Sequence, residues 1–403
     1  MIPRLRFLHL LFSSGAGQVL GIGCSLLVPF LYEPSSFGVY GVFLSINRLF
    51  SAVATGNLEG VIYTTQNPER RRSMVVLPLR FLFTFVLVLV LAILLIGKTA
   101  ASWLKLENGT QILWFIPLLI LAQGLGQIFV HFFNAEKQEK SLHAMQLATP
   151  SLPGLAKLGL YSFQSWGLII GHTAGATLAT LLGVFAFPKS IWKGMFQRSN
   201  QKYFKLFRSW WGWGAPSGLI NLLGLEALFL ITQNTSGVVL TGLLTFGFRY
   251  VKLPVEILNG ALTKTFLSDG AGKSTAILRV HVFKALRRYL WVALPFFLLV
   301  FIGAEVVVEE IWGPEWADAG KIATVVAPFL FIHGMGSLVA PVADLLGKLK
   351  WEFWFMALLT AGRISILYFL QDDWWQLIRV FMDFSIVVWL CYFGVMLRWL
   401  FKD

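Results

Sequence analysis

Five basic residues lie deep inside long apolar segments of this sequence: Arg48, Lys157, Arg249, Lys252 and Arg363. A charge at the centre of a bilayer costs about 2.5–3.5 kcal/mol on insertion scales, so such residues usually pair with acids or line a path that holds water or substrate. Arginine offers a planar fork of N–H donors that fits phosphate oxygens, and lysine adds a point charge. These residue types therefore predict a site for an anion that carries a phosphate or a diphosphate.

The clearest group lies in the stretch "TFGFRYVKLPVEI". Arg249, Lys252 and Glu256 stand at i, i+3 and i+7, which places them on one face of a helix. Lys252 and Glu256 are spaced to pair, which leaves Arg249 without a local partner. Pro254 removes one backbone hydrogen bond and permits a kink. An anion-binding cavity is the favoured interpretation, and a structural network of ion pairs between helices is the alternative.

The elements that hold these residues are membrane helices. Only 13% of the 403 residues are charged, against about 25% in soluble domains, and the mean hydropathy is +0.71. The chain is therefore expected to be an all-α polytopic membrane protein. Its formal net charge of +13 does not indicate a nucleic-acid partner, because most of the cations lie in loops on one side, as membrane topology requires.

About twenty apolar residues span a bilayer. On that basis the sequence predicts twelve transmembrane helices. Their ranges are 8–32, 37–65, 74–97, 110–134, 140–163, 165–187, 206–233, 237–267, 286–308, 321–346, 352–370 and 374–400. The fifth is the least apolar, because it holds Pro150, Pro153 and Lys157.

The charges of the connecting loops alternate from one side to the other. Twenty-two lysines and arginines fall in loops on one side, and only Lys98, Lys105 and Lys321 fall on the other. Because basic loops stay in the cytoplasm, both termini are expected to be cytoplasmic.

The longest cytoplasmic loop divides the twelve helices into two sets of six. We predict a lobe over residues 1–187, a linker over 188–205 and a second lobe over 206–403. The lobes show a weak internal repeat: "LFSSGAGQVLG" opens the first and "LFRSWWGWGAPSG" the second. Parallel repeats with a site between them are a common plan for transporters.

Three stretches resemble motifs of one known family. They are "LYEPSSFGVYGVFLSINRLFSAVA" (31–54), "GFRYVKLPVEILNGALTKTF" (247–266) and "IWGPEWADAGKIATVVAP" (311–328). Each is similar to a stretch of the bacterial polysaccharide and O-antigen flippases, which belong to the multidrug/oligosaccharidyl-lipid/polysaccharide exporter superfamily. The resemblance implies two six-helix lobes around a central cavity, alternating access, and no covalent chemistry.

The resemblance also implies the substrate and its site. The family moves undecaprenyl-diphosphate-linked oligosaccharides to the periplasmic leaflet of the bacterial inner membrane, and the positions that match its cavity cations are Arg48, Arg249 and Lys252. Lys157 and Arg363 are further candidate cavity cations. Glutamates are candidates for coupling to a proton or a sodium ion: Glu59, Glu226 and Glu256.

No catalytic residue, metal site or other cofactor is expected, so the chain is not expected to be an enzyme. We expect a monomer among membrane lipids, with the glycan polymerase and other polysaccharide-pathway proteins as candidate partners. Three alternatives stay open: a peptidoglycan-precursor flippase, a multidrug antiporter of the same superfamily, and a membrane glycan polymerase or glycosyltransferase. The multidrug reading is disfavoured because cationic drugs need buried carboxylates, and the deep residues here are mostly cationic.

Overall fold

The computed structural model describes residues 3–56, 58–63, 67–194, 210–270 and 275–402. Throughout these ranges the regular elements are helices, and no strand occurs among them. Ten of the helices are long and apolar enough to cross a membrane, and Gly15–Phe30 is a shorter apolar piece. The protein is therefore a multi-pass membrane protein. Its helices contact one another in two compact units, Met1–Leu206 and Phe207–Asp403.

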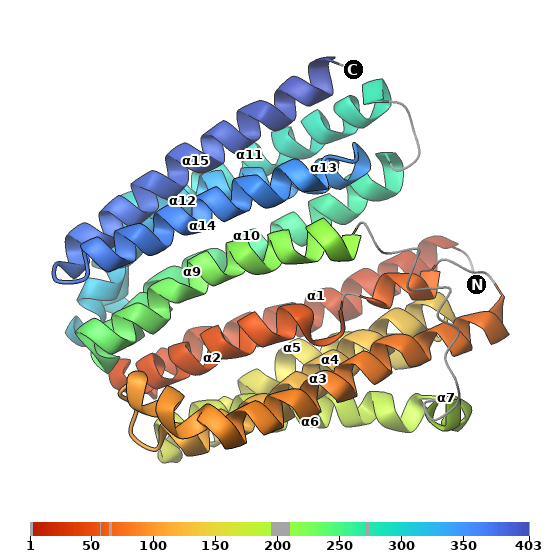
Figure 1. The fold of residues 1–403 in the computed structure, drawn as a ribbon, viewed down its shortest axis with the longest axis horizontal. Helices are drawn as coiled ribbons and strands as arrows, with labels where there is room; N and C mark the ends of the chain where they lie inside the picture. Colours follow the sequence, from red (N-terminus) through yellow and green to blue (C-terminus); the bar gives the residue numbers. More distant parts are fainter. Residues whose placement is uncertain (1–2, 57, 64–66, 195–209, 271–274, 403) are drawn as a thin grey trace. The chain divides into compact units, whose positions relative to one another are not determined.

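The first unit holds the helices of the amino-terminal half (Figure 1). They are α1 (Pro3–Leu27), α2 (Pro34–Ala54), the 3-10 helix η2 (Leu58–Tyr63), α3 (Pro68–Trp103), α4 (Gly109–Ala135), α5 (Glu139–Gly159), α6 (Ser165–Ala186) and the short α7 (Lys189–Gly194). The predicted linker 188–205 begins with α7, and its residues 195–205 lie outside the described residues.

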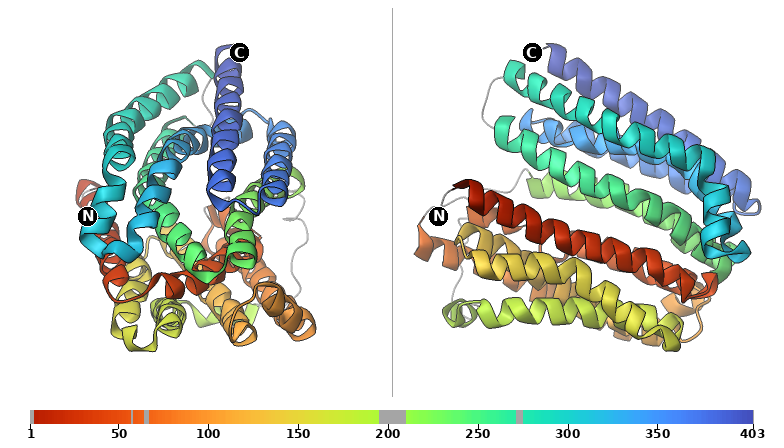
Figure 2. Two further views of the ribbon diagram at one scale, coloured as in Figure 1. Left: turned by 90° about the vertical axis from the view of Figure 1, so that its left-hand side faces the viewer. Right: turned by 180° about the vertical axis from the view of Figure 1, so that it is seen from behind.

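The second unit begins with the short π-helical turn η4 (Trp210–Gly214). It continues with α9 (Ala215–Ser236), α10 (Val238–Gly270), α11 (Thr275–Trp312), α12 (Ala317–Val339), the short α13 (Pro341–Leu345), α14 (Leu349–Phe369) and α15 (Trp374–Lys402). Within each unit the long helices run side by side along most of their length, as the two views of Figure 2 show.

The helices of the two units pair in the same order. In the first unit α1 packs on α5, α5 on α6, α3 on α4 and α4 on α6. In the second unit α9 packs on α14, α14 on α15, α11 on α12 and α12 on α15. The same partners thus recur in the chain order of both halves, which agrees with the internal repeat in the sequence.

Several predicted segments are interrupted in the structure, and the break within 37–65 bears on a candidate site residue. Residues 37–65 do not form a single helix, because α2 ends at Ala54 and a separate helix begins at Leu58. Gly56 lies between them with a φ of 64°, a backbone conformation that only glycine adopts without strain. Glu59 therefore belongs to η2, which packs on α3 and α4, and not to the helix that carries Arg48.

Helix α5 is held tightly between α1 and α6 by small residues. A Cβ atom at Gly21 of α1 would lie 2.6 Å from the carbonyl oxygen of Pro150, and one at Gly171 of α6 would lie 2.7 Å from the backbone nitrogen of Lys157. Glycine at such contacts lets helix backbones approach closely, which is the main way that helices associate in membranes. This packing fixes the position of Lys157.

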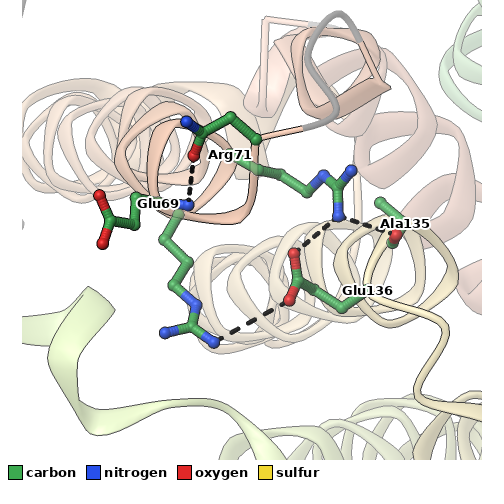
Figure 3. A network of polar contacts seen from close by, with 6 residues as sticks. Glu69, Arg71, Ala135 and Glu136 are labelled. Atoms are coloured by element: carbon green, nitrogen blue, oxygen red, sulfur yellow. Dashed lines mark hydrogen bonds and ion pairs between the residues drawn. The ribbon is translucent and has the colours of Figure 1, made fainter.

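An ion pair joins the start of α3 to the end of α4 (Figure 3). Arg71 donates from Nη1 to a carboxylate oxygen of Glu136 at 2.8 Å and to the carbonyl oxygen of Ala135 at 2.9 Å. That carbonyl is one of the last of α4, where the helix leaves acceptors without partners. The arginine therefore caps α4 while it ties the two helices together.

Candidate functional site

The first unit contains a continuous chain of polar side chains across three helices. The Tyr40 hydroxyl of α2 lies 2.5 Å from Nδ1 of His172 in α6. Nε2 of that histidine lies 3.5 Å from Nε2 of Gln123 in α4. Gln123 in turn accepts hydrogen bonds through Oε1 from Asn47 and Ser51 of α2, each at 3.1 Å. Such a chain inside an apolar bundle marks a site, because buried polar groups are retained only where they are satisfied or used.

Two of the predicted cations lie beside this chain. The Lys157 ammonium of α5 stands over the Tyr40 ring, 5.5 Å from its centroid, in a cation–π arrangement. Arg48 directly follows Asn47 of the polar chain in α2. Among the described residues, no carboxylate lies within ion-pair distance of Lys157. Lys157 thus lies beside the polar chain, and Arg48 belongs to the helix that carries Tyr40 and Asn47.

Tyr32 fixes the end of α5 near this cluster. It lies in the turn between α1 and α2 and donates its hydroxyl to the carbonyl oxygen of Lys157 at 2.6 Å. This hydrogen bond holds the backbone of Lys157 in place.

The second unit pairs Arg249 with an acid. Nη2 of Arg249 in α10 donates to a carboxylate oxygen of Glu226 in α9 at 3.0 Å. The exposed fractions of the two side chains are 7% and 0%. The guanidinium also lies 4.6 Å from the centroid of the Phe229 ring. Removing one partner of such a buried pair costs about 3–5 kcal/mol, because a buried charge is left uncompensated. The predicted cation Arg249 and the predicted coupling residue Glu226 thus form one buried ion pair.

The pairing of Lys252 with Glu256 is confirmed. The two charged groups lie 3.0 Å apart within α10. Glu256 is 45% exposed and Lys252 only 11%, so this carboxylate stays in contact with the surface. A screened pair of this kind contributes little to stability.

Arg363 differs from the other cations of this unit. It is 0% exposed and donates from Nε to the Ser385 hydroxyl of α15 at 3.0 Å and from Nη1 to the Asn221 side chain of α9 at 3.2 Å. The rings of Phe329 and Phe381 lie 5.7 and 5.3 Å from the guanidinium carbon. No described carboxylate lies within 4.0 Å of it. Arg363 is therefore a buried cation held only by neutral groups.

Some predicted site residues are brought together and others are not. Lys157 joins the polar chain beside Tyr40, Arg249 joins Glu226, and Lys252 joins Glu256. Glu59 is 7% exposed but belongs to η2, outside the helix of Arg48. The polar chain itself was not predicted from the sequence. The spacing of Tyr40, Asn47 and Ser51, at i, i+7 and i+11 on one apolar helix, was the available signal.

Solved structures with a similar fold are membrane transporters. A lipid II flippase MurJ in an inward closed conformation matches with a TM-score of 0.68 at 12% identity, covering 98% of this chain and 87% of that one. An inward-facing multidrug resistance MATE family transporter of the MOP superfamily matches with a TM-score of 0.64 at 10% identity, covering 95% and 94%. A Vibrio cholerae MATE transporter, VcmN, matches with a TM-score of 0.53 at 13% identity, covering 99% and 97%.

These likenesses show the fold of the multidrug/oligosaccharidyl-lipid/polysaccharide exporter superfamily. The curated proteins contain no match to the chain. A family model described as "Polysaccharide biosynthesis protein" matches residues 29–321, a range that includes Arg48, Lys157, Arg249 and Lys252. The resemblance seen in the sequence is thereby confirmed, and the chain belongs to this polysaccharide biosynthesis family.

Proposed function

We propose that this protein is a flippase that moves an undecaprenyl-diphosphate-linked oligosaccharide from the cytoplasmic to the periplasmic leaflet of a bacterial inner membrane. In this proposal twelve helices form two six-helix lobes, and alternating access exposes a central cavity to each side in turn. The protein works as a monomer beside the glycan polymerase of its pathway. The family to which the chain belongs supports a role in polysaccharide biosynthesis.

One observation carries the proposal at the level of residues. Lys157 stands over the Tyr40 ring of the polar chain, and no described carboxylate lies within ion-pair distance of Lys157. An excess of positive charge inside a membrane protein is stabilised when an anion enters. A diphosphate supplies two adjacent phosphates, which suits one arginine and one lysine. Arg249 and Lys252 are the further cations that we propose for recognition of the diphosphate.

The peptidoglycan-precursor alternative shares this chemistry, since both substrates carry a polyprenyl diphosphate. It differs only in the glycan, so identification of the bound lipid decides between them. A multidrug antiporter fits the residues less well. Cationic drugs need buried carboxylates, and the acids Glu226 and Glu256 are each already paired with a cation.

The test is to identify the lipids that co-purify with the protein in mild detergent by native mass spectrometry. We expect a polyprenyl-diphosphate glycan bound to the wild type and at least tenfold less of it bound to Arg48→Ala and Lys157→Ala. Arg379→Ala is the matched control, because Arg379 is an exposed arginine near the start of α15. Ordinary phospholipids alone, in equal amounts in all four proteins, would overturn the proposal.

A further inference from the structure

The Arg249–Glu226 pair presents a conflict for any anion that uses Arg249. The guanidinium already donates to the carboxylate of Glu226 at 3.0 Å. A phosphate that takes over this donor brings negative charge beside a carboxylate that is 0% exposed. A buried carboxylate that loses its partner has no water to solvate it. The anion and the ionised glutamate therefore cannot both be stable beside Arg249.

The two sides of the pair differ in what can reach them. The exposed fraction is 7% for the Arg249 side chain and 0% for Glu226. The arginine is thus the partner that an anion would reach first, and only a very small species can reach the carboxylate. A proton is the smallest such species, and it also removes the negative charge that the anion would face.

The groups that face Glu226 favour this assignment. Helix α10 brings Arg249, and helix α14 brings Arg363, which donates to Asn221 five residues before Glu226 on α9. The third element packed on α9 is η4, whose residues are tryptophans and glycines and do not titrate. The group that contacts Glu226 from α10 is therefore a cation, and it does not compete with Glu226 for a proton near neutral pH.

We propose that Glu226 and the diphosphate of the substrate exchange places on Arg249, so that binding of one lipid takes up one proton. In the exchange a carboxylate oxygen of Glu226 accepts a proton from water, its hydrogen bond from Arg249 breaks, and the freed N–H donors turn to the phosphate oxygens. Release of the lipid reverses each step. This inference rests on the proposed function. It assigns to the Arg249–Glu226 pair the coupling of substrate binding to proton uptake.

The chain offers a control of the same chemistry. Asp383 of α15 is an exposed carboxylate that belongs to no proposed contact with the substrate. Loss of the charge at Asp383 should therefore leave the proton count of binding unchanged.

The test measures binding of an undecaprenyl diphosphate that bears one hexose to the purified protein in detergent. Each phosphate of this probe carries one ester and one anhydride bond and a single strongly acidic hydroxyl, so the probe itself does not titrate near neutral pH. Calorimetry in buffers of different ionisation enthalpy gives the number of protons taken up. For one proton, the wild-type affinity should fall about tenfold for each pH unit above neutrality, because only the protonated glutamate releases Arg249. Glu226→Gln, which keeps a neutral hydrogen-bonding amide, should bind with an affinity independent of pH.

Uptake of one proton by the wild type and by Asp383→Asn, with none by Glu226→Gln, supports the exchange. Binding by the wild type with no proton uptake overturns the exchange and leaves the proposed function standing. Absence of binding to all three proteins at every pH overturns the proposed function and the exchange with it. Should Glu226→Gln fail to fold, absence of proton uptake by the wild type and by Asp383→Asn still overturns the exchange, and uptake of one proton by both supports it.

Discussion

At the scale of single residues, the buried cations differ in the groups that contact them. Lys252 and Glu256 are four residues apart on one helix, so their pairing could be predicted from spacing alone. The partner of Arg249 could not, because Glu226 lies 23 residues earlier on another helix and only the packing of α9 on α10 brings them together. The candidate cavity cation Arg363 is 0% exposed and donates to Ser385 and Asn221.

Burial of Arg363 leads to a prediction at this scale. Replacing a buried charged group with an apolar one of similar volume is often neutral or stabilising, by about 1–4 kcal/mol in studied cases. Among described residues Arg363 has no acid to offset its desolvation. We therefore expect Arg363→Met to unfold at the same temperature as the wild type or higher. We also expect it to translocate a diphosphate-linked glycan at least tenfold more slowly, because the positive field is lost.

Thermal unfolding in detergent and translocation in proteoliposomes check this prediction. The exposed Arg379→Met serves as the control and should change neither quantity. A fall of several degrees in the unfolding temperature of Arg363→Met, with a loss of translocation that matches the loss of folded protein, would show instead that Arg363 stabilises the packing of α9, α14 and α15.

At the scale of elements, hydropathy identifies helices but not all of their roles or limits. The helical class and most of the long helices follow from apolar runs of about twenty residues. Helix α5 is not among those apolar enough to cross a membrane by composition, yet the glycines of α1 and α6 pack it within the first unit. The end of α2 was also missed, since hydropathy continues past Gly56 and only its backbone conformation ends the helix.

The packing of α1 on α5 gives a matched pair of glycine substitutions. A Cβ atom at Gly21 would lie 2.6 Å from the Pro150 carbonyl oxygen, while nothing lies within 4 Å of one at Gly23. Overpacking costs about 1–3 kcal/mol, and glycine to alanine in a helix gains about 0.5–1 kcal/mol. We expect Gly21→Ala to lower the unfolding temperature and Gly23→Ala to hold or raise it. Equal shifts in both variants would contradict close packing of α1 on α5.

At the scale of the whole molecule, the recurrence of the same helix pairs in both halves is the structural counterpart of a weak sequence repeat. Apolar segments resemble one another by chance, so the repeat could only be suspected from sequence. The orientation in the membrane is inferred from the distribution of loop charge, because the packing of the helices is the same in either orientation. The assigned orientation therefore leads to a prediction that depends on the basic residues alone.

Helix α14 (Leu349–Phe369) provides the sharpest place to measure that orientation. Its 21 residues rise about 31 Å at 1.5 Å per residue, close to the roughly 30 Å of a bilayer core. The exposed Lys348 precedes the helix and the exposed Asp372 follows it.

With Cys24 and Cys391 replaced by alanine, a membrane-impermeant maleimide should label Asp372→Cys in cells whose outer membrane has been permeabilised, and Lys348→Cys only after lysis. The reverse pattern would place the basic loops outside and overturn the assigned orientation. Labelling of both sites before lysis would show that α14 does not cross the membrane.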